Sequence, residues 1–279
     1  MTEGWRYYNH ALIPTCAPHE SPNTESMDSE EFWKTDKGLV LFARWTDEFD
    51  NNEFSEFWYC IRKAPFVVDQ LPQRAKKHIR QALKKCYVRK VDALDHIDEL
   101  YEVFTEACKN YKLFDGNTEY NEFKKRCIND TNSGRDYWAG YSIEGKLIGY
   151  MIAEEKTDYA EIVSAKFHPG FLKMQVSDAL YVTVLDHYLN NLKKSYISSG
   201  TRSLNHITNT QEYKEKNFGY VKAYCKLHIV YNPKIRVLVR VLYPFRRILS
   251  LFDNISGIHK INSVLKMEEI VRKQKKEKR

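Results

Sequence analysis

Five polar or titratable residues in the second half of the chain could act as a general base: Glu161, Ser164, His168, Asn205 and His206. A carboxylate or an imidazole can take a proton from an attacking nucleophile if the fold brings it within hydrogen-bonding reach. His168 ends an expected strand, where a titratable side chain would face a bound ligand. A histidine before a proline is also an ordinary loop residue, and this interpretation is the favoured one. No Ser/His/Asp order, phosphate-binding glycine loop or metal-ligand spacing competes with these residues.

The elements that must position these residues alternate between strands and helices. Such alternation favours βαβ units and a largely parallel central sheet. Ligands of such sheets bind beyond the carboxyl ends of the strands, where helix N-termini present unpaired N–H groups. The turn between Phe167 and Val176 is therefore the expected binding region. The expected order is a strand over 161–167, a turn at His168-Pro169-Gly170, a helix over 176–192, a strand over 195–199, a helix over 208–217 and a strand over 220–231.

The residues before this stretch carry weaker signals. Residues 1–37 are polar and rich in Ser, Glu and Pro, so loose order is expected there. Apolar residues at helical spacing and alternating patterns define the remaining elements. The expected elements are strands over 39–45, 57–63 and 87–91, helices over 71–85, 94–110 and 119–129, and a hairpin over 135–155 that turns at Glu144-Gly145.

Composition is typical of a packed globular protein, with 279 residues of which 43% are hydrophobic and 14% aromatic. Six cysteines form no Cys-x-x-Cys pair, and the chain opens Met-Thr-Glu-Gly-Trp-Arg-Tyr-Tyr with no hydrophobic signal. A cytoplasmic location with reduced thiols is therefore expected. Positive charge is concentrated at the end of the chain, because residues 232–279 hold 13 Lys and Arg against 4 Asp and Glu.

From Tyr87 onward the expected order of elements is β-α-α-β-β-β-α-β-α-β. Three landmarks accompany it: Phe167-His168-Pro169 at a strand end, Phe171 and Val176 in the following loop and helix, and Tyr213 before Phe218-Gly219-Tyr220. In this order and these landmarks, residues 88–231 resemble the GNAT superfamily of acyl-CoA N-acyltransferases. The resemblance implies an α/β fold with a mixed central sheet flanked by helices.

A weaker likeness lies further upstream. Trp58, Arg62, Lys63 and the basic helix over 71–85 resemble the FemAB-like aminoacyl-transferases, which are built from GNAT-like halves. This second resemblance implies an aminoacyl-tRNA as the donor in place of a CoA thioester.

The GNAT resemblance implies roles for particular residues. It implies acetyl-CoA or another acyl-CoA as co-substrate, and a primary amine as acceptor. Tyr213 approximately matches the tyrosine that protonates the leaving thiolate, although a plain core or rim tyrosine explains it equally well. Glu161 and His168 are the candidates for the base. The residues implied to contact the cofactor are Phe167, Lys173, Met174, Gln175, Val176, Ser177 and Asn209.

The loop after the strand departs from the family pattern, which reads Arg/Gln-x-x-Gly-x-Gly/Ala. No glycine follows Gly170, and Lys173, Gln175 and Ser177 occupy the glycine positions. A helix N-terminus still offers donors and a partial positive charge, to which Lys173 adds a full one. Side chains at these positions narrow the backbone approach, and Asp178 would repel an anion. The sequence therefore leaves CoA binding by this loop open.

Two basic segments have no assigned role in this scheme. The helix over 71–85 places its basic side chains above an apolar stripe of Ala75, Ile79 and Leu83. It is either a solvated face or a wall that faces phosphorylated sugars, lipid head groups or tRNA. Its basic residues are Arg74, Lys76, Lys77, Arg80, Lys84 and Lys85.

The second basic segment follows residue 232. Arginines interrupt any apolar run long enough to span a bilayer, and Pro244 is expected to kink the helix. A basic amphipathic helix of this kind is typical of proteins that lie on an anionic membrane surface. Packing on its own body or on a second subunit, as in a homodimer, is the alternative. The apolar residues at helical spacing are Ile235, Leu238, Val241, Leu242, Phe245, Ile248, Leu249 and Phe252.

Together these observations predict three parts: an N-terminal extension over 1–86, a GNAT-like domain over 87–231 and a basic amphipathic appendage over 232–279. The predicted function is N-acyl transfer from a CoA thioester to a primary amine on a small-molecule or lipid-linked acceptor. The predicted location is the cytoplasm, with a peripheral position on the inner face of the membrane as the alternative. One alternative is a FemAB-like transferase that uses aminoacyl-tRNA. Another is a non-catalytic binding module that kept the fold and lost the cofactor loop.

Overall fold

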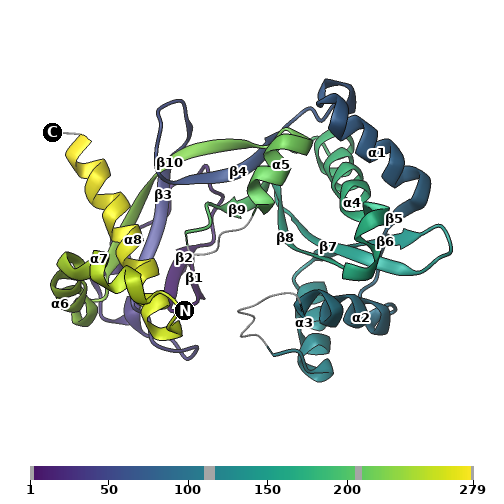
Figure 1. Cartoon of the computed structure of the whole chain (residues 1–279). Coiled ribbons are helices and arrows are strands. Elements are labelled where there is room, and N and C mark those ends of the chain that lie inside the picture. Colours follow the sequence, from purple (N-terminus) through teal and green to yellow (C-terminus); the bar gives the residue numbers. More distant parts are fainter. Residues whose placement is uncertain (1–2, 110–116, 205–208, 278–279) are drawn as a thin grey trace. The chain divides into compact units, whose positions relative to one another are not determined.

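The structure, a computed structural model, describes residues 3–109, 117–204 and 209–277 (Figure 1). Its internal contacts divide the chain into two compact units. Unit 1 is Met1–Tyr59, Thr201–Thr208 and Lys222–Arg279, and unit 2 is Cys60–Gly200 and Asn209–Val221. Described residues from both the N-terminal and the C-terminal parts of the chain thus belong to one unit. The predicted functional boundaries after residues 86 and 231 stay predictions.

Unit 2 is built on a mixed sheet whose strands follow the order β4-β9-β8-β7-β6-β5. The pairs β5–β6, β6–β7 and β7–β8 are antiparallel, and β8–β9 is parallel. The expected largely parallel sheet was therefore wrong, because tight connections join β6, β7 and β8 and only the crossover through α4 returns the chain in parallel. The strands are β4 (Trp58–Lys63), β5 (Cys86–Val91), β6 (Arg135–Ser142), β7 (Leu147–Glu155), β8 (Tyr159–Phe167) and β9 (Tyr196–Thr201).

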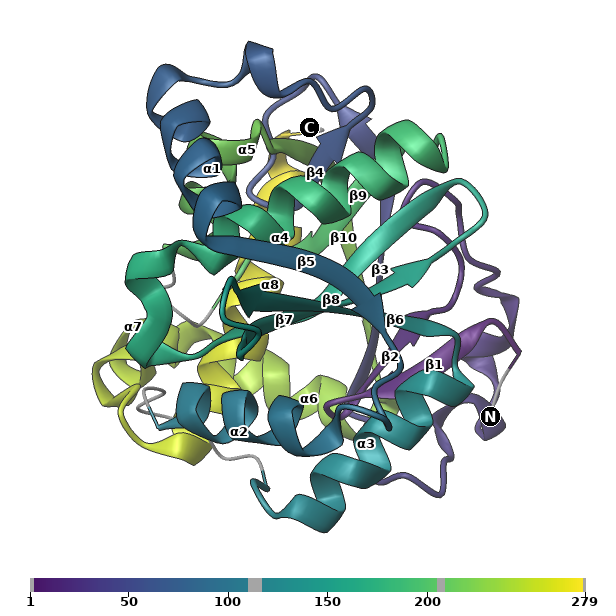
Figure 2. The ribbon, with the colours of Figure 1, turned by 90° about the vertical axis from the view of Figure 1, so that its right-hand side faces the viewer.

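Helices cover both faces of this sheet (Figure 2). One face packs against α1, α4 and α5 around Leu180, Tyr188 and Ile197, and the other packs against α2 and α3 around Leu100 and Phe123. The predicted mixed sheet flanked by helices is confirmed. The helices of unit 2 are α1 (Gln73–Lys85), α2 (Ile97–Cys108), α3 (Tyr120–Asn132), α4 (Val176–Leu185) and α5 (Thr210–Phe218), with the shorter turns η3 (Val68–Gln70), η4 (Pro169–Met174) and η5 (Asp186–Asn191).

Two expectations about these helices need correction. The helix expected over 176–192 is α-helical only to Leu185 and continues as the wider π-helical turn η5. Within that turn the Asn190 side chain bonds both backbone groups of Phe66, at 3.1 and 2.7 Å. Leu83, expected on the apolar stripe of α1, is exposed, because Ala82 takes the buried position instead.

Unit 1 has its own sheet, in the order β1-β2-β3-β10. Residues 1–37, expected to be loosely ordered, contribute β1, β2 and two short helical turns. Their aromatic side chains explain the difference, since Trp5 and Phe32 are buried and pack edge to face with ring centroids 5.5 Å apart. The elements are β1 (Trp5–Tyr8), β2 (Ala11–Pro14), η1 (Glu25–Asp28), η2 (Glu31–Trp33), β3 (Phe42–Asn51) and β10 (Val221–Tyr231).

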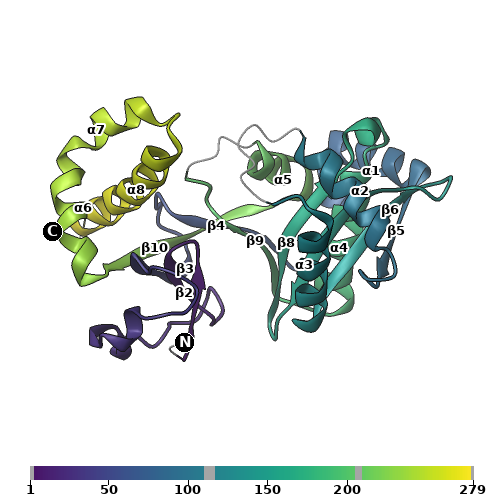
Figure 3. The ribbon, with the colours of Figure 1, turned by 90° about the horizontal axis from the view of Figure 1, so that it is seen from below.

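The chain ends in helices that also belong to unit 1 (Figure 3). Helix α8 packs against β3 and β10 through Met267, Ile270 and Val271. The expected kink at Pro244 is present, because α6 ends at Leu242 and a short turn follows. No helix of the described residues is long and apolar enough to cross a bilayer. The elements are α6 (Pro233–Leu242), η6 (Tyr243–Phe245), α7 (Arg246–Leu249), η7 (Ser250–Phe252) and α8 (Ser256–Glu277).

Candidate active site

Strands β8 and β9 separate within unit 2. Their parallel pairing runs from Tyr159–Tyr196 to Glu161–Ser198 and stops there, although β8 continues to Phe167. On its other side β8 stays paired with β7 as far as Phe167. The pairing with β7 shifts where Val163 is inserted as an extra residue, and such a bulge bends a strand and increases its twist. The binding region expected next to the end of β8 therefore lies where the two strands have parted.

Two glycines allow the N-terminus of α4 to pack closely against the sheet. Gly140 of β6 and Gly149 of β7 are direct cross-strand partners. A Cβ added at Gly140 would lie 2.5 Å from a Val176 methyl carbon, and one at Gly149 would lie 3.2 Å from the other. Because real Cβ atoms need more room than 2.5 Å, only glycine at Gly140 allows α4 to begin this close to the sheet.

The turn before α4 leaves polar groups unpaired. Gln175 adopts a left-handed conformation with φ of 62° and is the N-cap of α4. The amides of Val176 and Ser177 have no acceptor among the described residues, and the buried Gln175 Oε1 has no donor among them. Val176 itself is buried and Ser177 is half-buried. The start of α4 thus offers two N–H donors and one carbonyl acceptor, with the positive end of the helix dipole.

A tyrosine from α5 meets this helix start. The Tyr213 hydroxyl donates to Asp178 Oδ1 at 3.1 Å and lies 3.2 Å from Ser177 Oγ. Burial, together with the neighbouring Asp178 carboxylate, raises the pKa of Tyr213. Burial also raises the pKa of Asp178, which the hydrogen bond from Tyr213 offsets only in part. Tyr213 is therefore a neutral phenol at physiological pH, able to donate a proton or a hydrogen bond.

Sequence reasoning missed the neighbouring Lys214. Its side chain is buried, its Nζ donates to Ser199 Oγ at 2.5 Å, and it lies 5.9 Å from the centre of the Tyr181 ring. Burial lowers the pKa of Lys214, since the charged form loses hydration. Ser199 follows Ser198, the last β9 residue paired with β8. The buried cation therefore lies at the point where the strands part.

Other expected site residues take different positions. His168 accepts from the Gly170 amide through Nδ1 at 3.1 Å, and its Nε2 lies 3.9 Å from Glu102. The ring also packs edge to face on Phe171, so the favoured interpretation of His168 as a loop residue agrees with these contacts. Lys173 is exposed, and the Met174 carbonyl accepts from the Cys86 thiol at 3.5 Å. Their proposed contacts with a cofactor stay predictions.

Glu161 and Asn209 complete the predicted set. Glu161 is half-buried and faces Glu154 across the β7–β8 pair. Asn209 precedes α5 and is exposed, with its carbonyl accepting from the Tyr213 amide at 2.8 Å. Asn205 and His206 lie outside the described residues. The structure thus brings Ser177 and Tyr213 together, while Glu161 stands at the last position of β8 that is paired with β9.

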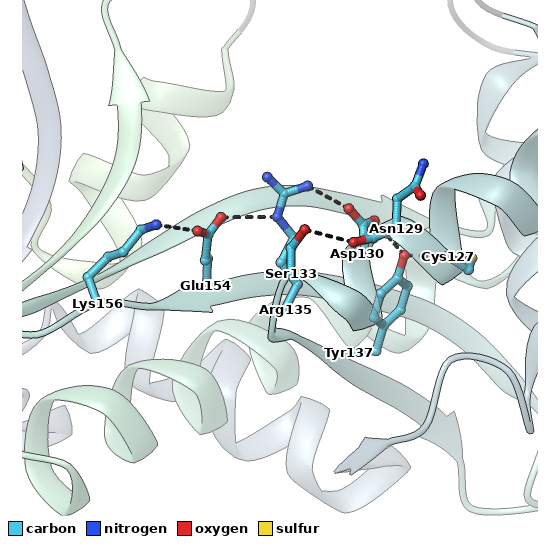
Figure 4. A network of polar contacts seen from close by, with 8 residues as sticks. All are labelled: Cys127, Asn129, Asp130, Ser133, Arg135, Tyr137, Glu154 and Lys156. Atoms are coloured by element: carbon cyan, nitrogen blue, oxygen red, sulfur yellow. Dashed lines mark hydrogen bonds and ion pairs between the residues drawn. The ribbon is translucent and has the colours of Figure 1, made fainter. Parts of the chain in front are cut away.

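A polar network around Glu154, the cross-strand partner of Glu161, connects the surrounding strands (Figure 4). Arg135 bridges Asp130 of α3 at 2.5 Å and Glu154 of β7 at 3.0 Å. Tyr137 donates to Asp130 at 2.8 Å, and Lys156 pairs with Glu154. Burial alone would raise the pKa of Glu154, but hydrogen bonds from Lys156 and Arg135 outweigh it and hold the pKa below its ordinary value. The network ties α3 to the strands that carry the site.

No protein-family model and no curated protein matches the chain. Among solved structures, it resembles the C-terminal domain (DUF2156) of a proposed lysylphosphatidylglycerol synthetase from Agrobacterium fabrum, with a TM-score of 0.50 and 13% identity over 85% of this chain and 84% of that one. It also resembles FemX, with a TM-score of 0.51 and 8% identity over 73% of this chain and 68% of that one.

A third similar structure is the ribosomal-protein-S18-alanine N-acetyltransferase from Escherichia coli, with a TM-score of 0.31 and 14% identity over 38% of this chain and 61% of that one. The two likenesses above show a shared fold.

Proposed function

We propose that the chain is an acyltransferase that moves an acyl or aminoacyl group from an activated ester to a primary amine. The observation that carries this proposal is the position of the Tyr213 phenol. It lies against Ser177 and Asp178 at the start of α4, beside two unpaired amides, where β8 has left β9. The unpaired amides and the neutral phenol are hydrogen-bond donors next to the point where the strand pairing ends. Such donors can stabilise the negative charge that develops on a carbonyl oxygen during acyl transfer.

The proposed reaction forms a C–N bond to the acceptor amine and breaks the carbonyl bond to the leaving oxygen or sulfur. The amine loses a proton, for which Glu161 is the proposed acceptor, and the leaving atom gains one, for which Tyr213 is the proposed donor. The Lys214 ammonium is the proposed partner of the negative charge that develops on the carbonyl oxygen. Its burial strengthens that interaction, because the local dielectric is low.

An aminoacyl ester of tRNA is the donor that we favour. Asp178, at the third position of α4, would repel the negative charge of a pyrophosphate. The side chains of Lys173, Gln175 and Ser177 stand where the GNAT pattern has glycines, and they would hinder a pyrophosphate from approaching the backbone. The exposed basic side chains of α1 offer contacts for an RNA backbone instead. The shared fold with FemX agrees with this choice. A tRNA donor also places the reaction in the cytoplasm.

An acyl-CoA thioester is the second candidate donor. It is favoured by the unpaired amides of Val176 and Ser177, which resemble the donors that hold phosphates at helix N-termini. Gln175, with φ of 62°, keeps the left-handed backbone that a glycine would ordinarily supply. For either donor, the proposed acceptor is a primary amine on a small molecule or a lipid-linked precursor.

A transfer assay with both donors tests this function. The purified chain is incubated with bulk tRNA charged with radiolabelled amino acids, or with labelled acetyl-CoA, and with a panel of amines that includes phosphatidylethanolamine vesicles, glucosamine and spermidine. We expect label to move from aminoacyl-tRNA to one amine class. We also expect Tyr213→Phe to lower the rate about 100-fold, which is a common loss for one proton-transfer group.

The matched control is Tyr87→Phe, which removes a hydroxyl from an exposed tyrosine of β5 in the same unit. It should leave the rate unchanged. Transfer from acetyl-CoA alone would select the second donor. Binding of a donor without transfer to any amine would support the non-catalytic module, and a Tyr213→Phe rate equal to that of the unmodified chain would contradict the proposed role of Tyr213.

A further inference from the structure

The helical segment from Pro233 to Phe252 leaves seven large apolar side chains exposed within unit 1. In α6 only Val239 is buried, whereas Val237 is 65% exposed. Further along, Leu251 is 78% exposed. Single exposed apolar residues are common, but a run of them at helical spacing marks an interaction surface. We call this surface the apolar face, formed by Val237, Leu238, Val241, Phe245, Ile248, Leu251 and Phe252.

Positive charge accompanies the apolar face. No acidic residue occurs from Pro233 to Phe252, while five basic residues do. On a helical projection of α6, Arg236 and Arg240 lie beside the arc that holds Val237 and Val241. Arg246 pairs with Glu269 at 3.5 Å. The four that form no ion pair with a described residue are Lys234, Arg236, Arg240 and Arg247.

A basic cleft opens next to the same segment. Its volume is about 510 Å³, and Tyr243 of η6 forms part of its wall. The guanidinium carbons of Arg246 and Arg272 lie 4.4 and 3.8 Å from the centre of the Tyr243 ring. Lys275 and Lys276 also line the cleft, against one carboxylate from Glu269. A cleft with this excess of cations suits the phosphate of a lipid head group.

We propose that the apolar face docks onto an anionic phospholipid bilayer, with head-group phosphates bound by the flanking arginines and the basic cleft. Apolar side chains would enter the boundary between head groups and acyl chains, while the cations remain at the phosphate level. This proposal concerns a different surface from the candidate active site, and it does not depend on the acyl-transfer chemistry.

Charge complementarity selects this partner over two others. A second copy of the chain would bring two segments with five cations and no acid against each other, which costs energy by repulsion. The phosphates of RNA would attract the arginines, but RNA bases bind by stacking on aromatic rings and would gain little from Val, Leu and Ile side chains. An anionic bilayer uses both the charge and the apolar side chains.

Vesicle sedimentation tests the proposal with the full chain. Vesicles of phosphatidylcholine alone are compared with vesicles that contain 30% phosphatidylglycerol, at about 0.15 M salt. We expect binding only to the anionic vesicles. Arg236→Gln/Arg240→Gln should weaken binding about tenfold or more, because each basic residue near such a surface contributes measurably. Val237→Ser/Val241→Ser should weaken it by a similar factor through lost insertion.

Matched controls come from the same unit. Lys34→Gln/Lys37→Gln removes the same charge elsewhere, and Leu39→Ser removes a leucine that is 61% exposed. Both should bind vesicles like the unmodified chain, and circular dichroism checks that every variant is folded. The assay contains no acyl donor or acceptor, so its result is separate from that of the transfer assay.

Three outcomes would overturn the proposal. The first is equal binding to both kinds of vesicle, or equal weakening by the control variants. The second is binding to RNA but to neither vesicle, unchanged by Val237→Ser/Val241→Ser. The third is a dimer in light scattering that Val237→Ser/Val241→Ser dissociates, together with no vesicle binding by the unmodified chain.

Discussion

The Tyr213 hydroxyl donates a hydrogen bond of 3.1 Å to a buried carboxylate oxygen of Asp178, so a residue of α5 is fixed to the first turn of α4. The same hydroxyl lies 3.2 Å from Ser177, which leaves it a second partner if the first bond is broken. Breaking this hydrogen bond is costly, because it would leave the buried Asp178 carboxylate without its partner.

Replacing Asp178 with Asn should change how stability depends on pH. Burial raises the pKa of Asp178, so the folded state holds the carboxyl proton more tightly than the unfolded state does. Stability therefore falls as pH rises from the ordinary Asp value of about 3.9 through the raised pKa. Asn cannot ionise, yet its oxygen can still accept from Tyr213. In urea unfolding, the free energy of unfolding of Asp178→Asn relative to the unmodified chain should be more favourable at pH 7 than at pH 4. An equal difference between the two proteins at both pH values would count against a raised pKa of Asp178.

Replacing the buried Lys214 with Met should separate activity from stability. We expect transfer to slow by about 100-fold, as for the loss of one oxyanion donor. Stability at pH 7 should stay the same or rise, since a buried ammonium is replaced by an apolar side chain of similar length. Lys216→Met on the same helix is the control, because that side chain is exposed and pairs with Glu212, one turn away on the same helix. Steady-state rates and thermal unfolding of both variants check this.

The lowered pKa of Lys214 adds a pH signature to that experiment. The folded state binds this proton less tightly than the unfolded state, because burial opposes the charge. The unmodified chain should therefore gain stability as pH rises through the folded pKa toward about 10.4, and Lys214→Met should lack that gain. Parallel slopes for the two proteins in this range would rule out a buried, strained ammonium.

Adding one methyl group at Gly140 should displace the start of α4. The new Cβ would lie 2.5 Å from a Val176 methyl carbon, and overpacking of this kind costs about 1–3 kcal/mol. Val176→Ala removes that methyl carbon, so Gly140→Ala/Val176→Ala should lose less than the sum of the two single changes. Gly149→Ala should have a smaller effect, because its nearest contacts are 3.1–3.3 Å. Urea unfolding of the four variants gives the coupling energy, and strict additivity would argue against the contact.

Breaking the Arg135 network should make the chain less sensitive to acid. The pKa of Glu154 is held below its ordinary value, so its stabilising contribution is present above about pH 4.3 and is lost as pH falls through the folded pKa. Arg135→Met should cost about 1–2 kcal/mol at pH 7 and progressively less as the pH falls below about 4.3. Lys125→Met, which breaks the exposed pair with Glu122 on α3, should cost a few tenths. A loss for Arg135→Met that stays constant as the pH falls below about 4.3 would mean that Glu154 is not its functional partner.

Local patterns in the sequence identified most elements of unit 2, and long-range packing explains what they missed. The strand–turn–helix from Glu161 to Val176 and the kink at Pro244 follow from residue spacing and proline geometry. The Gly140–Gly149 pair could not be found this way, because its meaning depends on a helix that follows about 30 residues later. Lys214, in a helix rich in charged residues, looks exposed until the fold covers it.

The strand pairing was misjudged for a similar reason. Alternation of strands and helices around α4 predicted a largely parallel sheet, but the hairpins on either side of β7 make most of the sheet of unit 2 antiparallel. The first 37 residues were misjudged from their polar average, which hides the few aromatic residues that bury them. Among those residues Trp5 and Phe32 are almost completely inaccessible.

The glycine pair that faces Val176 has an evolutionary consequence. In any natural relative that keeps this arrangement, a gain of volume at position 140 must be matched by a loss at position 176, because the two side chains would claim the same space. Positions 140 and 176 should therefore substitute in concert across homologous chains, and an alignment in which they vary independently would show that α4 can begin further from the sheet.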